Sequence, residues 1–167
     1  HNGELQRFMN KFHAYLDYMK EGKTEWEQIL LIRDWLHRAI PRTSYQSFKK
    51  IYTRPYPKGE TPGPFEMLES AGAGLEWWCP HFSNMLAFLY TGAGFVSRKL
   101  GNVSKYHPKF GTYTHGVTDI FVNELGKWVQ MDAHFDIHYT KNDVPLSPAE
   151  IGQEYFENGG ESINRVV

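Results

Sequence analysis

Hydrophobic residues in the first part of the chain recur at steps of three and four, which is the spacing of one face of an amphipathic helix. The first run predicts a helix within residues 1–22. A second run begins at a capping-box pattern formed by Thr24 and Glu27, and it ends at Pro41. Both helices are expected to be scaffold that supports the rest of the fold.

The helical spacing is lost over residues 41–63, where four prolines alternate with four aromatic residues. A loop of this length inside a compact domain is unusual and often functional. Two interpretations stay open: an ordered surface loop pinned by its aromatic side chains, or one wall of a groove for a peptide or carbohydrate. Pro64 then favours a short helix that ends near Gly72.

The most informative stretch begins at Trp77-Trp78-Cys79-Pro80. Because the fixed φ and missing N–H of proline suit the first position of a helix, we expect a helix that opens at Cys79 or Pro80 and ends at Gly92 or two residues later. Cys79, the only cysteine, then lies at the positive end of the helix dipole, which favours a thiolate. A lone cysteine is more often a small buried hydrophobic residue, so a catalytic role requires partners.

Beyond residue 94 the pattern changes to the alternation that is typical of strands. We expect a strand over residues 95–100, a loop over 101–114 and a second strand over 115–123. After a hairpin turn, residues 128–133 return as the antiparallel partner. Helices followed by an antiparallel meander predict an α+β fold.

A last helix signal combines a capping box of Ser147 and Glu150 with Pro148 in the first turn. It predicts a short helix to about Glu157. The length of 167 residues suits one domain, residues 1–167, with a core large enough to need no covalent staples.

Two titratable residues of the predicted hairpin can complete a site around the cysteine. If the turn is centred as expected, antiparallel pairing places His115 opposite His134 and Asp132 opposite Val117. Asp132 and His115 are then diagonal neighbours on one face of the sheet. Packed against the tip of the cysteine helix, Cys79, His115 and Asp132 would serve as nucleophile, general base and orienting acid.

Five segments carry a further signal in their order and spacing. They are the cysteine helix with Ser83 and Ala87, the strand Gly94-Phe-Val-Ser-Arg98, the strand His115-Gly-Val-Thr-Asp-Ile-Phe, the return Gly126-Lys-Trp128-Val-Gln-Met-Asp132, and the helix Ile32-Arg-Asp-Trp35 to Ile40. Together they resemble the transglutaminase-like core, a branch of the papain-like cysteine enzymes, over about residues 26–151. The resemblance implies a papain-like fold with a catalytic core over residues 77–140, the triad Cys79, His115 and Asp132, and no cofactor.

The chain departs from the family pattern at several positions. Trp77 stands where the family has a glycine, Gly116 and Val117 follow the histidine in place of Ala-Trp, and Ala133-His134 replace Pro-Thr after the acid. These departures leave the triad in place and leave the substrate class open.

The chemistry implied by the resemblance is acyl transfer. The Cys79 thiolate attacks an amide carbonyl, His115 protonates the leaving amine, and water or a second amine resolves the thioester. We expect a peptidase or amidase first, acting on a protein or peptide, and a cross-linking enzyme second. Because Pro80 has no N–H, the oxyanion would be held by the Cys79 N–H and a side-chain donor. The candidates for oxyanion or substrate contacts are Trp77, Trp78, Tyr45 and Gln46.

Two rival interpretations use other residues. Acidic residues and histidines alternate from residue 132 to 138, and a continuing strand would place them on one face, as ligands for zinc in a metal-dependent hydrolase. These residues are Asp132, His134, Asp136 and His138. The ordinary explanation for such alternation is a strand that faces solvent. The second rival is a catalytically retired transglutaminase-like domain that binds peptide or glycan through its aromatic loop, although the presence of all three triad residues argues against it.

Composition narrows the remaining classes. The chain is 41% hydrophobic and 22% charged, with a formal net charge of −1 and no basic run, so nucleic acid and anionic membrane surfaces are poor partners. No apolar stretch approaches the ~20 residues of a membrane span. One cysteine excludes an internal disulfide and a cysteine-based zinc cluster. The start at His1 suggests a trimmed fragment from which any export signal would already be removed, and it leaves compartment and oligomeric state open.

Overall fold

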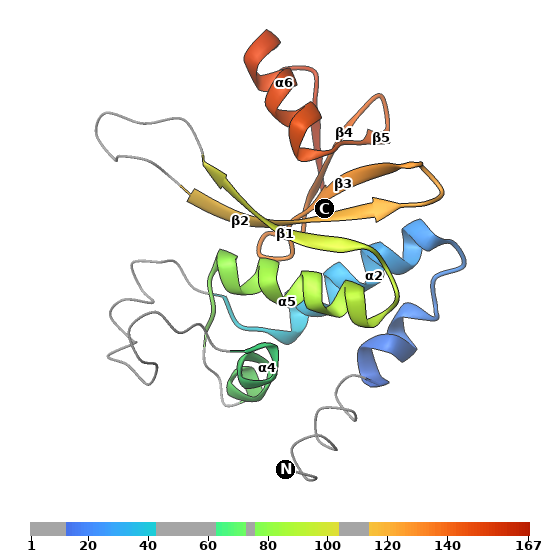
Figure 1. The fold of residues 1–167 in the computed structure, drawn as a ribbon, viewed down its shortest axis with the longest axis vertical. Helices are drawn as coiled ribbons and strands as arrows, with labels where there is room; N and C mark the ends of the chain where they lie inside the picture. Colours follow the sequence, from blue (N-terminus) through green and yellow to red (C-terminus); the bar gives the residue numbers. More distant parts are fainter. Residues whose placement is uncertain (1–12, 43–62, 73–75, 104–113) are drawn as a thin grey trace.

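The computed structural model describes residues 13–42, 63–72, 76–103 and 114–167 (Figure 1). Its named elements in chain order are α2 (Glu25–Ala39), α4 (Pro64–Gly72), α5 (Cys79–Gly92), β1 (Ser97–Val103), β2 (Thr114–Val122), β3 (Lys127–Met131), β4 (His138–Lys141), β5 (Val144–Pro145), α6 (Pro148–Asn158) and β6 (Asn164–Val166). The sheet β1-β2-β3 separates α5, α2 and α4 on one side from α6 and the second sheet on the other (Figure 1). This mixture of helices and antiparallel sheet confirms the α+β class.

The helices begin and end where local chemistry predicts. Thr24 Oγ1 accepts a hydrogen bond from the backbone N–H of Glu27 at 3.1 Å, and Glu27 returns the contact to the Thr24 N–H. Ser147 and Glu150 make the same reciprocal cap on α6. Of the first predicted helix, residues 13–19 are helical and residues 1–12 lie outside the described part. Most of the predicted aromatic loop, residues 43–62, also lies outside it.

The central sheet has the predicted register. The turn between β2 and β3 contains Gly126 at φ +62°, a left-handed conformation that suits glycine. Thr118 lies opposite Met131 and Ile120 opposite Val129, which continues the pairing expected from the turn position. Gly116 and Thr118 contact α5, so Val117, Asp119 and Phe121 face the other side of the sheet, while His115 at the start of β2 lies beside the tip of α5.

The predicted bounds of the first strand are wrong at both ends. Phe95 belongs to the turn that follows α5, because its backbone N–H donates to the Tyr90 carbonyl at 2.9 Å and Gly94 turns the chain at φ +94°. β1 therefore starts at Ser97. It then continues through Gly101, which the sequence suggested as the start of a loop, because Gly101 pairs with Gly116 of β2.

The continuing strand over residues 132–138, which the metal-site interpretation required, does not form. Residues 133–136 form a tight turn, closed by backbone hydrogen bonds of 3.0 Å in both directions between Asp132 and Ile137. Asp136 adopts φ +54° in this turn. The chain then enters a second antiparallel sheet of order β5-β4-β6, which the sequence pattern did not predict.

The main core lies between α5, α2 and the central sheet. Its fully buried aliphatic members come from all three elements and include Ile29, Ile32, Leu36, Met85, Leu86, Leu89, Ile120, Val122, Val129 and Met131. Burying one such side chain contributes roughly 1.5–3 kcal/mol. The hydroxyl groups of two buried tyrosines donate hydrogen bonds to backbone carbonyls of helices. Tyr15 donates to Leu89 and Tyr90 to Ile29, each at 3.0 Å. Among the helices that the structure describes, none is both long and apolar enough to cross a bilayer.

Candidate active site

Cys79 is the first residue of α5, as the proline after it predicts. Trp78 precedes it in an extended conformation at φ −122° and ψ 174°, and no side chain caps this helix end. The backbone N–H groups of His81 and Phe82 bond to the Trp78 carbonyl, at 3.0 and 3.3 Å. The positive end of the helix dipole therefore falls at the thiol, which is 8% exposed.

Gly116 brings the histidine strand into direct contact with the tip of α5. A Cβ atom at Gly116 would lie 2.8 Å from Pro80 Cα and 2.8 Å from Ser83 Oγ, closer than side chains pack. Thr118 extends the contact, because its hydroxyl donates to the Ser83 carbonyl at 2.9 Å. Only a residue without a side chain permits this approach. The sequence signal for this close contact is Gly116 itself, directly after His115. In the sequence it stands out only as a departure from the family pattern.

His115 and Asp132 meet as the register requires. His115 Nε2 lies 2.5 Å from Asp132 Oδ2. The second carboxylate oxygen, Oδ1, accepts hydrogen bonds from the backbone N–H groups of His134 and Phe135, at 2.9 and 3.3 Å. The aspartate is 4% exposed and held on both oxygens, so it orients the imidazole ring firmly.

The electrostatics of His115 link all three residues. Burial by itself would lower its pKa, but hydrogen bonds to Asp132 and Cys79, together with their charges, outweigh burial and raise the pKa to about 10. Since Nε2 faces Asp132, the remaining ring nitrogen Nδ1 is the one available to the Cys79 thiol. A protonated imidazole at this position carries the positive charge that a thiolate–imidazolium pair requires of its histidine.

Two side chains of the 133–136 turn cover the histidine. The Phe135 ring lies 5.2 Å from the His115 ring, and the His134 ring packs between Phe135 at 4.6 Å and Phe82 at 5.2 Å. Phe135 is 55% exposed, so it presents an aromatic surface beside the site. No local sequence pattern marks Phe135, so its place beside the site could not be predicted.

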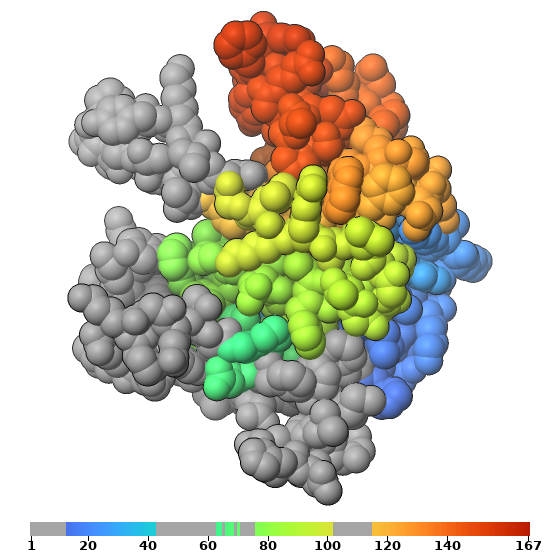
Figure 2. Space-filling model, viewed as in Figure 1, coloured from blue at the N-terminus to red at the C-terminus, as the bar shows by residue number. Residues whose placement is uncertain are grey.

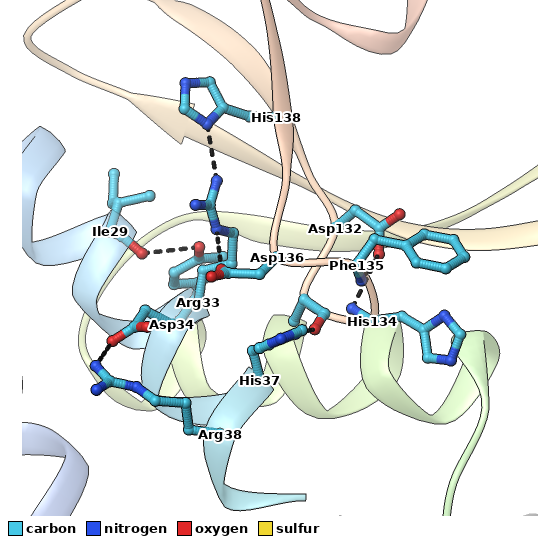
Figure 3. Close-up of polar contacts among 12 residues, drawn as sticks. Ile29, Arg33, Asp34, His37, Arg38, Asp132, His134, Phe135, Asp136 and His138 are labelled. Carbon is cyan, nitrogen blue, oxygen red and sulfur yellow. Dashed lines mark hydrogen bonds and ion pairs between the residues drawn. The ribbon is translucent and has the colours of Figure 1, made fainter. Parts of the chain in front are cut away.

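A buried charged network holds the same turn from behind (Figure 3). Arg33 of α2 is 3% exposed; its Nε donates to Asp136 Oδ1 at 2.8 Å and its Nη1 contacts His138 Nδ1 at 2.7 Å. Burial and the Arg33 charge lower the pKa of His138 to about 4, so this ring is neutral and accepts the bond. His37, one turn further along α2, contacts the Ala133 carbonyl at 2.9 Å. α2 thereby fixes the turn whose backbone holds Asp132.

The structure separates the residues of the proposed metal strand. Asp132 contacts His115, whereas Asp136 and His138 are both held by Arg33. No group of three or more potential metal ligands forms among the residues that the structure describes. The metal-hydrolase interpretation depended on a continuing strand, and the turn at residues 133–136 removes that basis.

The predicted oxyanion and substrate residues differ in their placement. Trp77 is 1% exposed and packs 4.8 Å from the His81 ring, so it belongs to the core and offers no surface to a substrate. Trp78 is half-buried directly beside Cys79, which keeps it next to the site. Tyr45 and Gln46 lie outside the described residues.

The chain matches no protein-family model and has no significant match among curated proteins. The function must therefore be argued from the site itself.

Proposed function

We propose that this chain is a thiol-dependent acyl-transfer enzyme that hydrolyses peptide or amide bonds, within a transglutaminase-like domain of papain-like fold. The observation that supports it best is the meeting of three residues from separate elements. His115 lies 2.5 Å from Asp132, and Cys79 at the start of α5 contributes with Asp132 to the raised pKa of His115. Nucleophile, base and orienting acid are the three groups that this chemistry requires.

In the first half of the proposed reaction, Cys79 Sγ attacks the carbonyl carbon of the substrate amide. The bond from carbon to nitrogen breaks, and the protonated His115 transfers its proton to the leaving amine. The acyl group remains on sulfur as a thioester. Asp132 keeps the imidazole in position and stabilises its charged form before the proton is transferred.

In the second half, neutral His115 takes a proton from a water molecule that attacks the thioester. The carboxylic acid product leaves and the thiolate and imidazolium are restored. Water is our preferred acceptor because the side chain of His115 is 30% exposed and Phe135 beside it is 55% exposed. An amine acceptor, giving cross-linking, is the second possibility.

The oxyanion of the tetrahedral intermediate needs donors near the helix tip. Pro80 offers no N–H, so we assign the first donor to the Cys79 backbone. Of the side chains in the described ranges that the sequence suggested, Trp78 is the one beside the nucleophile. Losing one such donor typically costs about 3 kcal/mol of transition-state stabilisation.

The test is the rate of Cys79 alkylation by iodoacetamide against pH. We expect the wild type to reach its half-maximal rate well below the pH of ~8.5 that is typical of a free thiol. His115→Ala should lose that shift, and His13→Ala, which changes an exposed histidine, should keep it. Slow alkylation with one pH dependence in all three proteins would make Cys79 a core residue and overturn the proposal.

Turnover is measured in parallel with fluorescently labelled casein for hydrolysis and dansylcadaverine incorporation for cross-linking. Cys79→Ala should abolish the activity, and Asp132→Ala should lower it less while leaving the fold intact. Full activity in both variants would refute the triad. A shifted alkylation profile without turnover would favour the retired binding domain.

A further inference from the structure

A concave surface lies on the face of the central sheet that is turned away from α5. It is a pocket of about 460 Å³ between the strands and the start of α6, within the size range of small-molecule sites. In Figure 2 the red atoms of α6 stand over the yellow and orange atoms of the sheet on this side. Its aromatic walls are Phe121 and Trp128, and Asp119 and Arg98 also line it.

Asp119 is the unusual residue of this pocket. It is 0% exposed, and its Oδ2 accepts two hydrogen bonds from Arg98, from Nε at 2.9 Å and from Nη2 at 2.7 Å. Its other oxygen, Oδ1, is buried and accepts no hydrogen bond from any residue in the described ranges. A buried acceptor without a donor is costly, and natural structures rarely leave one. A donor supplied by a bound molecule would satisfy it.

The charges around the pocket are balanced. Arg98 pairs with Asp119, and Lys127 pairs with Glu150 at 2.7 Å. The Arg98 guanidinium lies 4.1 Å from the centre of the Trp128 ring, which fixes it against the wall. Each positive side chain of the lining is therefore paired with a negative one, so the pocket favours a neutral ligand over a cation or an anion.

We propose that this pocket binds a neutral small molecule that combines an apolar ring with one hydroxyl or amide N–H group, and that this group donates a hydrogen bond to Asp119 Oδ1. Phe121 and Trp128, whose rings lie 5.7 Å apart at 74°, provide the apolar contact. The site is independent of the proposed catalysis. Asp119 lies four residues along β2 from His115, which is roughly 13 Å in a strand.

The test uses 4-methylphenol and toluene, which share the ring but differ in the hydroxyl donor. The wild-type chain is titrated with each, and binding is followed by NMR at the Trp128 indole and the β1–β3 amides. We expect 4-methylphenol to bind roughly tenfold to a hundredfold more tightly, because its donor pairs with a charged acceptor. Equal affinities, or no response at Trp128 with either probe, would overturn the proposal without involving any variant.

Two variants refine the result. Asp119→Leu removes the acceptor and should reduce the affinity for 4-methylphenol to that for toluene. Arg98 loses its partner in this variant, but its side chain is 54% exposed and can bind water instead. Glu157→Gln is the control, since it changes an exposed residue of α6 that does not line the pocket, and it should leave both affinities unchanged. Unchanged affinity in a folded Asp119→Leu protein would refute the assigned hydrogen bond.

Discussion

Replacing Gly116 with alanine tests the contact on which the proposed triad depends. The added Cβ would lie 2.8 Å from Pro80 Cα, and it would need at least 3.4 Å for an ordinary contact. The obstructing atoms include the Pro80 backbone, so relief requires β2 and the tip of α5 to move apart by about 0.6 Å. Overpacking of this kind costs about 1–3 kcal/mol of unfolding free energy.

The same displacement separates Cys79 from His115. Since a 1 Å misplacement of reacting groups can cost about a hundredfold in rate, we expect a loss on the order of tenfold in turnover. Urea unfolding measures the first effect, and casein hydrolysis with the alkylation profile of Cys79 measures the second. The alkylation profile should move toward that of a free thiol.

Gly101 provides a matched control for this experiment. It lies directly opposite Gly116 in β1, and a Cβ there would meet nothing within 4 Å. Gly101→Ala should therefore leave stability, alkylation and turnover close to wild type. If Gly116→Ala behaves like Gly101→Ala, the close approach of strand and helix does not matter and the reasoning fails.

Two further predictions concern buried groups behind the site. Arg33→Met should cost about 3–5 kcal/mol in urea unfolding because it leaves the Asp136 carboxylate, whose side chain is only 13% exposed, without its partner. Arg38→Met, at a side chain that is 61% exposed, should change stability by less than about 1 kcal/mol. Equal costs would refute the assigned role of the Arg33 network. Burial lowers the pKa of both His138 and His81 to about 4, while an unfolded histidine protonates near ~6.5. Protons then bind preferentially to the unfolded chain, so stability should fall as pH drops from 6.5 toward 4. His138→Gln should reduce the difference in unfolding free energy between pH 7 and pH 5, and an unchanged difference would contradict the assignment.

The parts of the fold that could be predicted depend on local backbone chemistry. The capping boxes at Thr24 and Ser147 and the proline after Cys79 each determine a helix start within one residue. One turn position, together with the two-residue period of strands, was enough to place His115 beside Asp132. These signals depend only on residues that are close together in the sequence, so they can be recognised without knowing how distant segments pack.

The parts that could not be predicted depend on contacts across the chain. Alternating acids and histidines after residue 131 suit a strand and a turn equally well, and the turn is favoured by the bond from Asp136 to Arg33, 103 residues away. The need for glycine at residue 116 follows from how closely α5 approaches β2. Neither contact leaves a periodic signal, because each involves a single pair of positions.

α2 connects the two halves of the proposed triad. On one side the Ile29 carbonyl accepts a hydrogen bond from Tyr90 of α5, the helix that starts at Cys79; on the other, Arg33 holds the turn that orients Asp132 (Figure 3). Ile29 and Arg33 are four residues apart, so both contacts arise from neighbouring positions on one helix face. A movement of α2 would therefore shift nucleophile and acid together, whereas a change at Gly116 separates the nucleophile Cys79 from His115. This difference explains why we expect Arg33→Met to act mainly on stability and Gly116→Ala to act on the reactivity of the thiol as well.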